Sequence, residues 1–186
     1  MGLKTFKPYT KSNRGTILVD RTGLWKGKPF KSLVSPKNSM KGRNNNGHIT
    51  SSNRAGGHKK MYRHIDFYRK KFDMPAKVER IEYDPNRSCY IMLVKFEDNT
   101  FAYYLAPQKI SVGDKIENGS KKEIKIGNCM PLQDIPVGID IHNVEIQPGA
   151  GGKIARAAGS SVTISGICLL YTSDAADEED SVDLGG

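Results

Sequence analysis

Residues 78–105 read VERIEYDPNRSCYIMLVKFEDNTFAYYL, and this stretch decides the fold class. The segment from Tyr90 to Phe96 is almost continuously apolar, which predicts a strand buried on both faces. Polar turn residues separate it from strands that we expect at 78–83 and 101–105, and a further strand is expected at 110–112. Short strands at this spacing, without a long helical period, predict a small β-barrel.

The residues that follow this barrel suggest a second, smaller β-unit. We expect strands at 144–147 and 162–164, and one helical turn closed by glycine at 154–159. The chain then changes abruptly at residues 167–186, which contain six acidic residues and no lysine or arginine. We expect this acidic tail to be non-native and the second β-unit to be incomplete.

Positive charge is concentrated in front of the barrel. Residues 1–71 hold 18 lysines and arginines against two acidic residues, in a chain whose net charge is +9. Residues 1–60 are also poor in apolar side chains, so they cannot offset their own ordering entropy by burial. We expect an extended basic arm that a polyanionic partner orders.

Within and beyond this arm, several stretches have the composition of an RNA-binding surface. Glycine allows close backbone approach, asparagine both donates and accepts, and lysine and arginine neutralise phosphate. Aromatic side chains interleaved with cations add base stacking. The predicted RNA-contacting residues are Arg43, Asn44, Asn45, Asn46, Gly47, His48, Arg54, Gly56, Gly57, His58, Lys59, Lys60, Tyr62, Arg63, Arg69, Lys70, Lys71, Arg87, Lys153 and Arg156. A solvated basic linker would have a similar composition.

Other chemistry has little support in the sequence. His48, His58 and His64 are ten and six residues apart, a spacing that matches no helical metal site, and no Cys-x-x-Cys pair is present. The loop beginning at Gly149 lacks the Gly-Lys-Ser/Thr ending of a nucleotide-binding loop. We interpret the barrel carboxylates, Glu82 among them, as solubilising charge. We therefore expect no catalytic residue, metal, cofactor or small-molecule substrate. No secretory signal or membrane-spanning run is evident.

A set of motifs in a fixed order resembles bacterial-type ribosomal protein L-two, a family of the large subunit. These motifs are Gly42–Gly47, Gly56–Lys59, Asp66-Phe67, Val78–Ser88, Tyr104–Pro107, Ile135–Gly138, His142–Glu145, Pro148–Gly152, Ala155-Arg156 and Ala158-Gly159. The resemblance covers roughly residues 1–166. It implies a basic N-terminal extension at 1–60, an OB-fold RNA-binding barrel at 61–126 and a partial SH3-like barrel at 127–166.

The same resemblance implies a function. The expected role is structural: binding to large-subunit ribosomal RNA beside other ribosomal proteins, supporting subunit association and the peptidyl-transferase region. Family members normally continue into a basic C-terminal extension that this sequence lacks, so we carry over no part in peptide transfer. We expect a cytoplasmic location on the ribosome, with an organellar ribosome as a further option. The alternatives are a free OB-fold single-strand RNA binder or translation factor, or an enzyme using the histidines.

Overall fold

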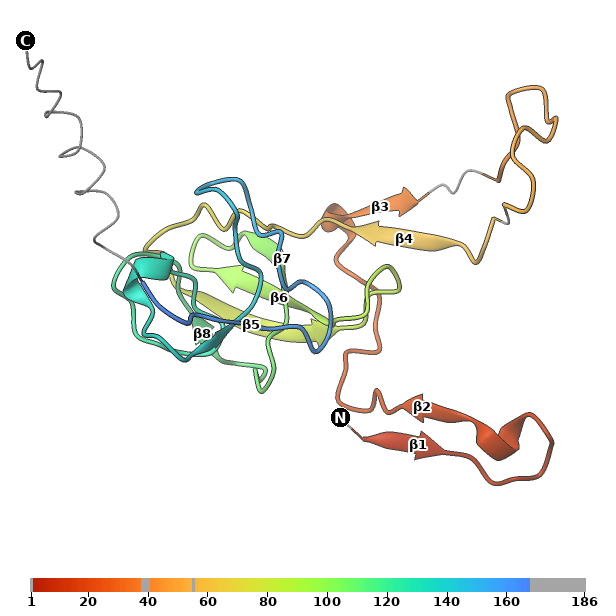
Figure 1. Cartoon of the computed structure of the whole chain (residues 1–186), viewed down its shortest axis with the longest axis horizontal. Helices are drawn as coiled ribbons and strands as arrows, with labels where there is room; N and C mark the ends of the chain where they lie inside the picture. Colours follow the sequence, from red (N-terminus) through yellow and green to blue (C-terminus); the bar gives the residue numbers. More distant parts are fainter. Residues whose placement is uncertain (1, 38–40, 55, 168–186) are drawn as a thin grey trace, which may run out of the picture.

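The centre of the protein is strand β6 (Ile91–Phe96), in a computed structural model that describes residues 2–37, 41–54 and 56–167. It belongs to a four-stranded antiparallel sheet with the order β7–β6–β5–β8. The other strands are β5 (Ala76–Glu82), β7 (Phe101–Leu105) and β8 (Lys115–Ile116). Figure 1 shows this sheet curled into a half-barrel. All regular structure in the described residues is strand or 3-10 helix, which confirms the predicted mainly β fold.

Strand β6 is buried on both faces, as its apolar run predicts. Met92 and Val94 point into the larger hydrophobic cluster, while Ile91 and Leu93 point into a smaller one on the opposite face. The smaller cluster is closed by Phe30, which comes from the basic arm. Each such side chain contributes about 1.5–3 kcal/mol relative to exposure, so the arm gains stability by covering this face.

Two features bend and close the sheet. Strand β5 carries a β-bulge between Val78 and Arg80, and bulges increase the local bend and twist of a strand. The strand predicted at 110–112 is not formed. Instead, the Ser111 amide donates to the Asp114 carboxylate at 2.7 Å, in a tight turn that leads into β8. This local side-chain acceptor competes with strand pairing, and the sequence prediction was wrong there.

The basic arm is extended, yet it contains regular pairing that its composition did not indicate. Strands β1 and β2 form one antiparallel pair, and β3 and β4 form a second that projects away from the barrel (Figure 1). The elements are β1 (Leu3–Thr5), η1 (Asn13–Gly15), β2 (Ile17–Val19), η2 (Lys31–Leu33), β3 (Val34–Lys37) and β4 (Lys60–Arg63).

The second β-unit has little regular structure. It holds η3 (Leu132–Asp134) and one antiparallel pair, β9 (Asp140–Ile141) with β10 (Val162–Thr163). The strand predicted at 162–164 is thus confirmed in part, whereas the strand at 144–147 is reduced to a single bridge between Val144 and Ile154. The helical turn predicted at 154–159 is absent, because Ile154 and Ala155 pair with the Val144 segment instead. Residues 168–186, most of the predicted acidic tail, lie outside the described residues.

Candidate RNA interface

The tip of the β3–β4 projection is a loop closed by its own hydrogen bonds. The side-chain oxygen of Asn44 accepts from the backbone amides of Asn46 at 3.1 Å and His48 at 2.9 Å. Gly42 is buried in the neck of the loop, where a Cβ atom would lie 2.4 Å from the Ser51 carbonyl oxygen. The glycine and the first asparagine of the motif therefore shape the loop, and they hold its other side chains outward.

The structure places the predicted residues of this tip on an exposed surface, far along the projection from the barrel (Figure 1). The exposed members are Arg43, Asn44, Asn45, Asn46, Gly47, His48 and Arg54 in the loop, Gly57, His58 and Lys59 in the segment that leads back to β4, and Lys60 at the start of β4, with Gly56 half-buried. No described residue here forms a salt bridge. The cations of the tip are therefore available to phosphate.

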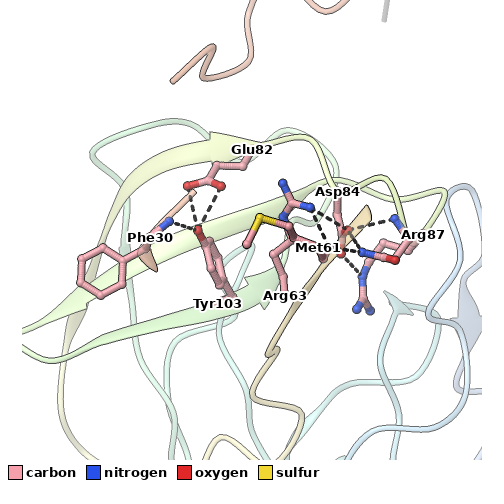
Figure 2. A network of polar contacts seen from close by, with 8 residues as sticks. Phe30, Met61, Arg63, Glu82, Asp84, Arg87 and Tyr103 are labelled. Carbon is pink, nitrogen blue, oxygen red and sulfur yellow. Dashed lines mark hydrogen bonds and ion pairs between the residues drawn. The ribbon is translucent and has the colours of Figure 1, made fainter. Parts of the chain in front are cut away.

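At the base of the projection, a buried carboxylate organises the turn after β5. The Asp84 side chain is fully buried, and its Oδ2 accepts from Arg87 Nε at 2.6 Å (Figure 2). Its Oδ1 accepts from the backbone and side-chain amides of Asn86, each at 2.9 Å, and lies 3.8 Å from Arg63 Nη1. The Asn86 side chain also donates to the Met61 carbonyl at 2.7 Å, which ties the turn to β4.

A loop of the second β-unit packs beside β4 and the turn after β5. The Arg156 guanidinium carbon lies 3.9 Å from the centre of the Phe67 ring, and its Nη1 donates to the Gly152 carbonyl at 3.3 Å. The Ala158 amide donates to the Ser88 hydroxyl at 3.1 Å, so the loop is tied to the turn after β5. Arg156 remains exposed although its ring contact fixes it.

The base of the β3–β4 projection, the turn after β5 and the Arg156 loop together border an open cleft of about 400 Å³. Its walls are formed by Lys37, Tyr62, Asn86, Arg87, Ser88, Arg156 and Ala157. Three cations and one half-buried tyrosine line it, with a buried oxygen of Asn86 that accepts no hydrogen bond. Cations suit phosphate, and the tyrosine ring suits base stacking.

Outside the tip, five predicted residues do not line this cleft. Arg63 turns inward, where its Nη1 donates to the Met61 carbonyl at 2.9 Å and lies 3.8 Å from Asp84 Oδ1. Arg69 is 6% exposed, donates to the Gly127 carbonyl at 2.8 Å and stacks on the Tyr104 ring, so we assign it a structural role. Lys71 is paired with Asp98 at 2.5 Å. Lys70 and Lys153 are exposed but do not line this cleft.

The structure also adds residues that the sequence reasoning missed. Lys37, Asn86 and Ser88 line the cleft. Asn86 and Ser88 follow Asp84-Pro85, a pair of residues typical of turns, so the turn chemistry of the sequence was the signal that could have located them.

The interpretation of Glu82 as surface charge was wrong. It is 3% exposed and accepts hydrogen bonds from Tyr103 and Arg80 inside the protein. Alternating strand patterns do not predict such a buried polar network.

One thiol, that of Cys89, lies beside the cleft wall. Cys89 donates through its sulfur to the Arg156 carbonyl at 3.2 Å, and burial raises the pKa of this thiol above its ordinary value. The neutral thiol is a poor nucleophile at physiological pH. Among the described residues, no cluster of histidine, cysteine and acidic side chains has the arrangement of a metal site. In the same part of the chain, no helix is long and apolar enough to cross a membrane.

Comparisons with known proteins agree with this architecture. The family model described as Ribosomal Proteins L2, RNA binding N-terminal domain, matches residues 30–118. The model described as Ribosomal Proteins L2, C-terminal domain, matches residues 125–174. Large ribosomal subunit protein uL2 of Pelagibacter ubique is 82% identical over 173 residues, which cover 92% of this chain and 62% of the relative. The protein of the same name from Granulibacter bethesdensis is 57% identical over 166 residues, covering 89% and 60%.

The curled β-sheet with its basic projection and these matches define the class, which is that of large-subunit ribosomal proteins. Within that class the chain belongs to the L2 family, also called uL2. The chain spans about three fifths of the length of the relatives it matches. The N-terminal match begins at residue 30, so it includes η2, β3 and the tip loop as well as the barrel.

Proposed function

We propose that this protein is a structural component of the large ribosomal subunit that binds large-subunit ribosomal RNA. The observation that supports this most directly is the convergence of Arg87 and Arg156 on one cleft, from segments far apart in the sequence. Both guanidinium groups are oriented by internal partners, Asp84 for one and Phe67 for the other. Orientation before binding lowers the entropy cost of contacting a folded RNA.

The tip and the cleft divide the work of recognition in this proposal. The tip loop enters an irregular region of the RNA, where exposed asparagines meet base edges and riboses. The cleft takes the sugar-phosphate backbone and one stacked base against Tyr62. Arg43, Asn45, Asn46 and His48 are the tip contacts that we propose, and Lys37, Arg87 and Arg156 are the cleft contacts. Lys59 and Lys60, at the entry to β4, add neutralising charge.

The proposed domain organisation keeps the arm at residues 1–60 and an OB-fold barrel at 61–126. Residues 127–166 are the partial SH3-like barrel. The barrel and this unit meet through the Arg156–Phe67 and Ala158–Ser88 contacts, so they present one surface. Further partners are other ribosomal proteins, and the role is architectural, supporting subunit association and the peptidyl-transferase region without catalysis.

The proposed location is the ribosome of the cytoplasm. The relatives named above are bacterial, and they give no support to the organellar option. The alternative of a free OB-fold single-strand binder or translation factor is not favoured, because both family models belong to a ribosomal protein.

The proposal is tested by titrating large-subunit ribosomal RNA at several salt concentrations in a filter-binding assay. We expect a steep fall of affinity with salt, because each neutralised phosphate adds about −0.7 to −0.9 to the slope of log K against log salt. An affinity that scarcely changed between low and moderate salt would contradict the proposal. Residues 61–126 alone should bind more weakly than the full chain. Equal binding would favour the single-strand alternative.

A further inference from the structure

Trp25 is half exposed, yet the protein holds it in a fixed position at the edge of the barrel. Its backbone amide donates to the Ile81 carbonyl at 2.8 Å, and Trp25 forms a parallel bridge with Glu82. Strand β8 covers only the other end of β5, near Ala76, so the arm takes the free edge at this end. The residue lies outside every RNA-contacting set assigned above.

The indole ring is positioned by two further contacts. The Arg80 guanidinium carbon lies 4.9 Å from the ring centre, and Arg80 is itself fixed by Glu82, 2.6 Å from its Nε. The ring also lies against Gly27, where a Cβ atom would be 2.5 Å from the indole nitrogen. Only glycine allows so close an approach. Trp25 as a whole residue remains 49% exposed despite these contacts.

The surroundings of this ring are cationic. Residues 21–31 contain two arginine or lysine positions on each side of Gly27 and no acidic residue. Lys26 and Lys28 are exposed, and neither forms a salt bridge with a described residue. Arg21 lies 3.8 Å from the centre of the Tyr83 ring, which is also partly exposed, so a second cation–aromatic pair stands beside the first.

We propose that Trp25 is a stacking platform for an unpaired nucleotide of RNA, with Lys26 and Lys28 neutralising the adjoining phosphates. The inference rests on the proposed function and adds a contact at the arm–barrel junction. A fixed aromatic face costs little entropy on binding, and base–aromatic stacking tolerates any base. A protein partner would be favoured by aliphatic surroundings, whereas here the neighbours are cations that match the charge of a phosphate backbone.

The chain contains one tryptophan, so its fluorescence reports on this position alone. The full chain is titrated with single-stranded oligoadenylate of about twelve nucleotides, within the usual site size of single-strand binders. We expect Trp25 emission to be quenched in step with binding, followed separately by the anisotropy of an end-labelled oligonucleotide. An oligonucleotide with abasic positions throughout should bind through charge and leave the emission unchanged.

Variants separate stacking from folding. Trp25→Leu should lower the affinity for oligoadenylate by roughly 5- to 150-fold, the range that one stacked base contributes. Trp25→Phe retains an aromatic face and should recover most of that loss. Tyr9→Leu removes an exposed aromatic elsewhere in the arm and should leave the affinity unchanged. Equal urea midpoints for wild type and Trp25→Leu exclude unfolding as the cause of a lower affinity. If the midpoints differ, the affinity of Trp25→Phe is compared with that of wild type instead.

The outcomes distinguish this inference from the proposed function. If ribosomal RNA binds in the filter assay while Trp25 emission stays unchanged with either RNA, the stacking platform is overturned and the proposed function stands. Equal affinities of wild type and Trp25→Leu overturn it as well. If no RNA binds, the proposed function itself fails.

Discussion

The hydroxyl of Tyr103 lies 3.0 Å from each of the two carboxylate oxygens of Glu82 (Figure 2), and Tyr103 is buried in the cluster that Phe30 of the basic arm covers. The same hydroxyl accepts a hydrogen bond from the Phe30 amide at 2.8 Å. One side chain thus joins a buried charge on β5 to the beginning of η2 in the basic arm. Arg80 and Trp25 continue this series of contacts from Glu82 to the surface.

Tyr103→Phe should destabilise the protein by about 1.5–3 kcal/mol, the usual worth of a hydrogen bond to a charged group. The variant leaves Glu82 short of a donor and the Phe30 amide short of an acceptor. Urea unfolding measures the loss. Tyr104→Phe is the matched control, since it removes a hydroxyl from the other face of β7 without touching Glu82, and it should cost less.

The same junction predicts a loss of stability in alkali. Burial raises the pKa of Tyr103 above its ordinary value of 10, and the neighbouring Glu82 charge raises it further. Above pH 10 an unfolded tyrosine gives up its proton while Tyr103 in the folded protein retains it, so unfolding becomes more favourable as pH rises. Stability should fall above pH 10 less steeply in Tyr103→Phe than in wild type. Parallel curves would contradict the assignment.

The Lys71–Asp98 pair should be visible in an acid titration. The hydrogen bond from Lys71, with further bonds from Thr100, lowers the pKa of the Asp98 carboxyl from 3.8 to about 2. The stabilisation is complete above the ordinary value and is lost as pH falls toward 2. Lys71→Met should move the NMR titration midpoint of Asp98 partly back toward 3.8. Lys70→Met should leave it in place, because Lys70 lies over Tyr68 instead.

Two arginines from different segments, Arg156 and Arg69, should behave oppositely. Arg156→Ala should weaken RNA binding and reduce the salt slope by about 0.7–0.9, the share of one phosphate contact, with little change in stability. Arg69→Ala should lower the free energy of unfolding, because the Gly127 carbonyl loses its buried donor and the Tyr104 ring loses its cation. Filter binding and urea unfolding on both variants separate the roles. A stable Arg69→Ala protein with weak RNA binding would reverse our assignment.

In the tip loop, Asn44 should act through its neighbours. Asn44→Ala removes the acceptor of the Asn46 and His48 amides, so hydrogen exchange at His48 should become faster. Asn44→Asp keeps an acceptor oxygen and should preserve the protection. Asn45→Ala should leave exchange unchanged while lowering RNA affinity. Unchanged His48 exchange in Asn44→Ala would show that the loop does not depend on this side chain.

The sequence by itself determined the central strand, its two neighbours and the concentration of cations before the barrel. An apolar run such as 91–96 must be covered on both faces, and a segment with many cations and few apolar groups favours an extended arm. These are properties of composition and spacing, which act locally. The fixed order of glycine, asparagine and proline motifs also determined the family, because each marks a particular backbone conformation or contact.

Only the tertiary structure decided which cations face outward. Arg69 and Arg156 have the same chemistry, yet one is buried against Tyr104 and the other lines the cleft. Glu82 was interpreted as surface charge, and it is buried because the Tyr103 hydroxyl reaches it from β7. The helical turn expected at 154–159 gave way to pairing with Val144 for the same reason. Burial and pairing of this kind depend on residues distant in the chain, so the local spacing of residue types does not predict them.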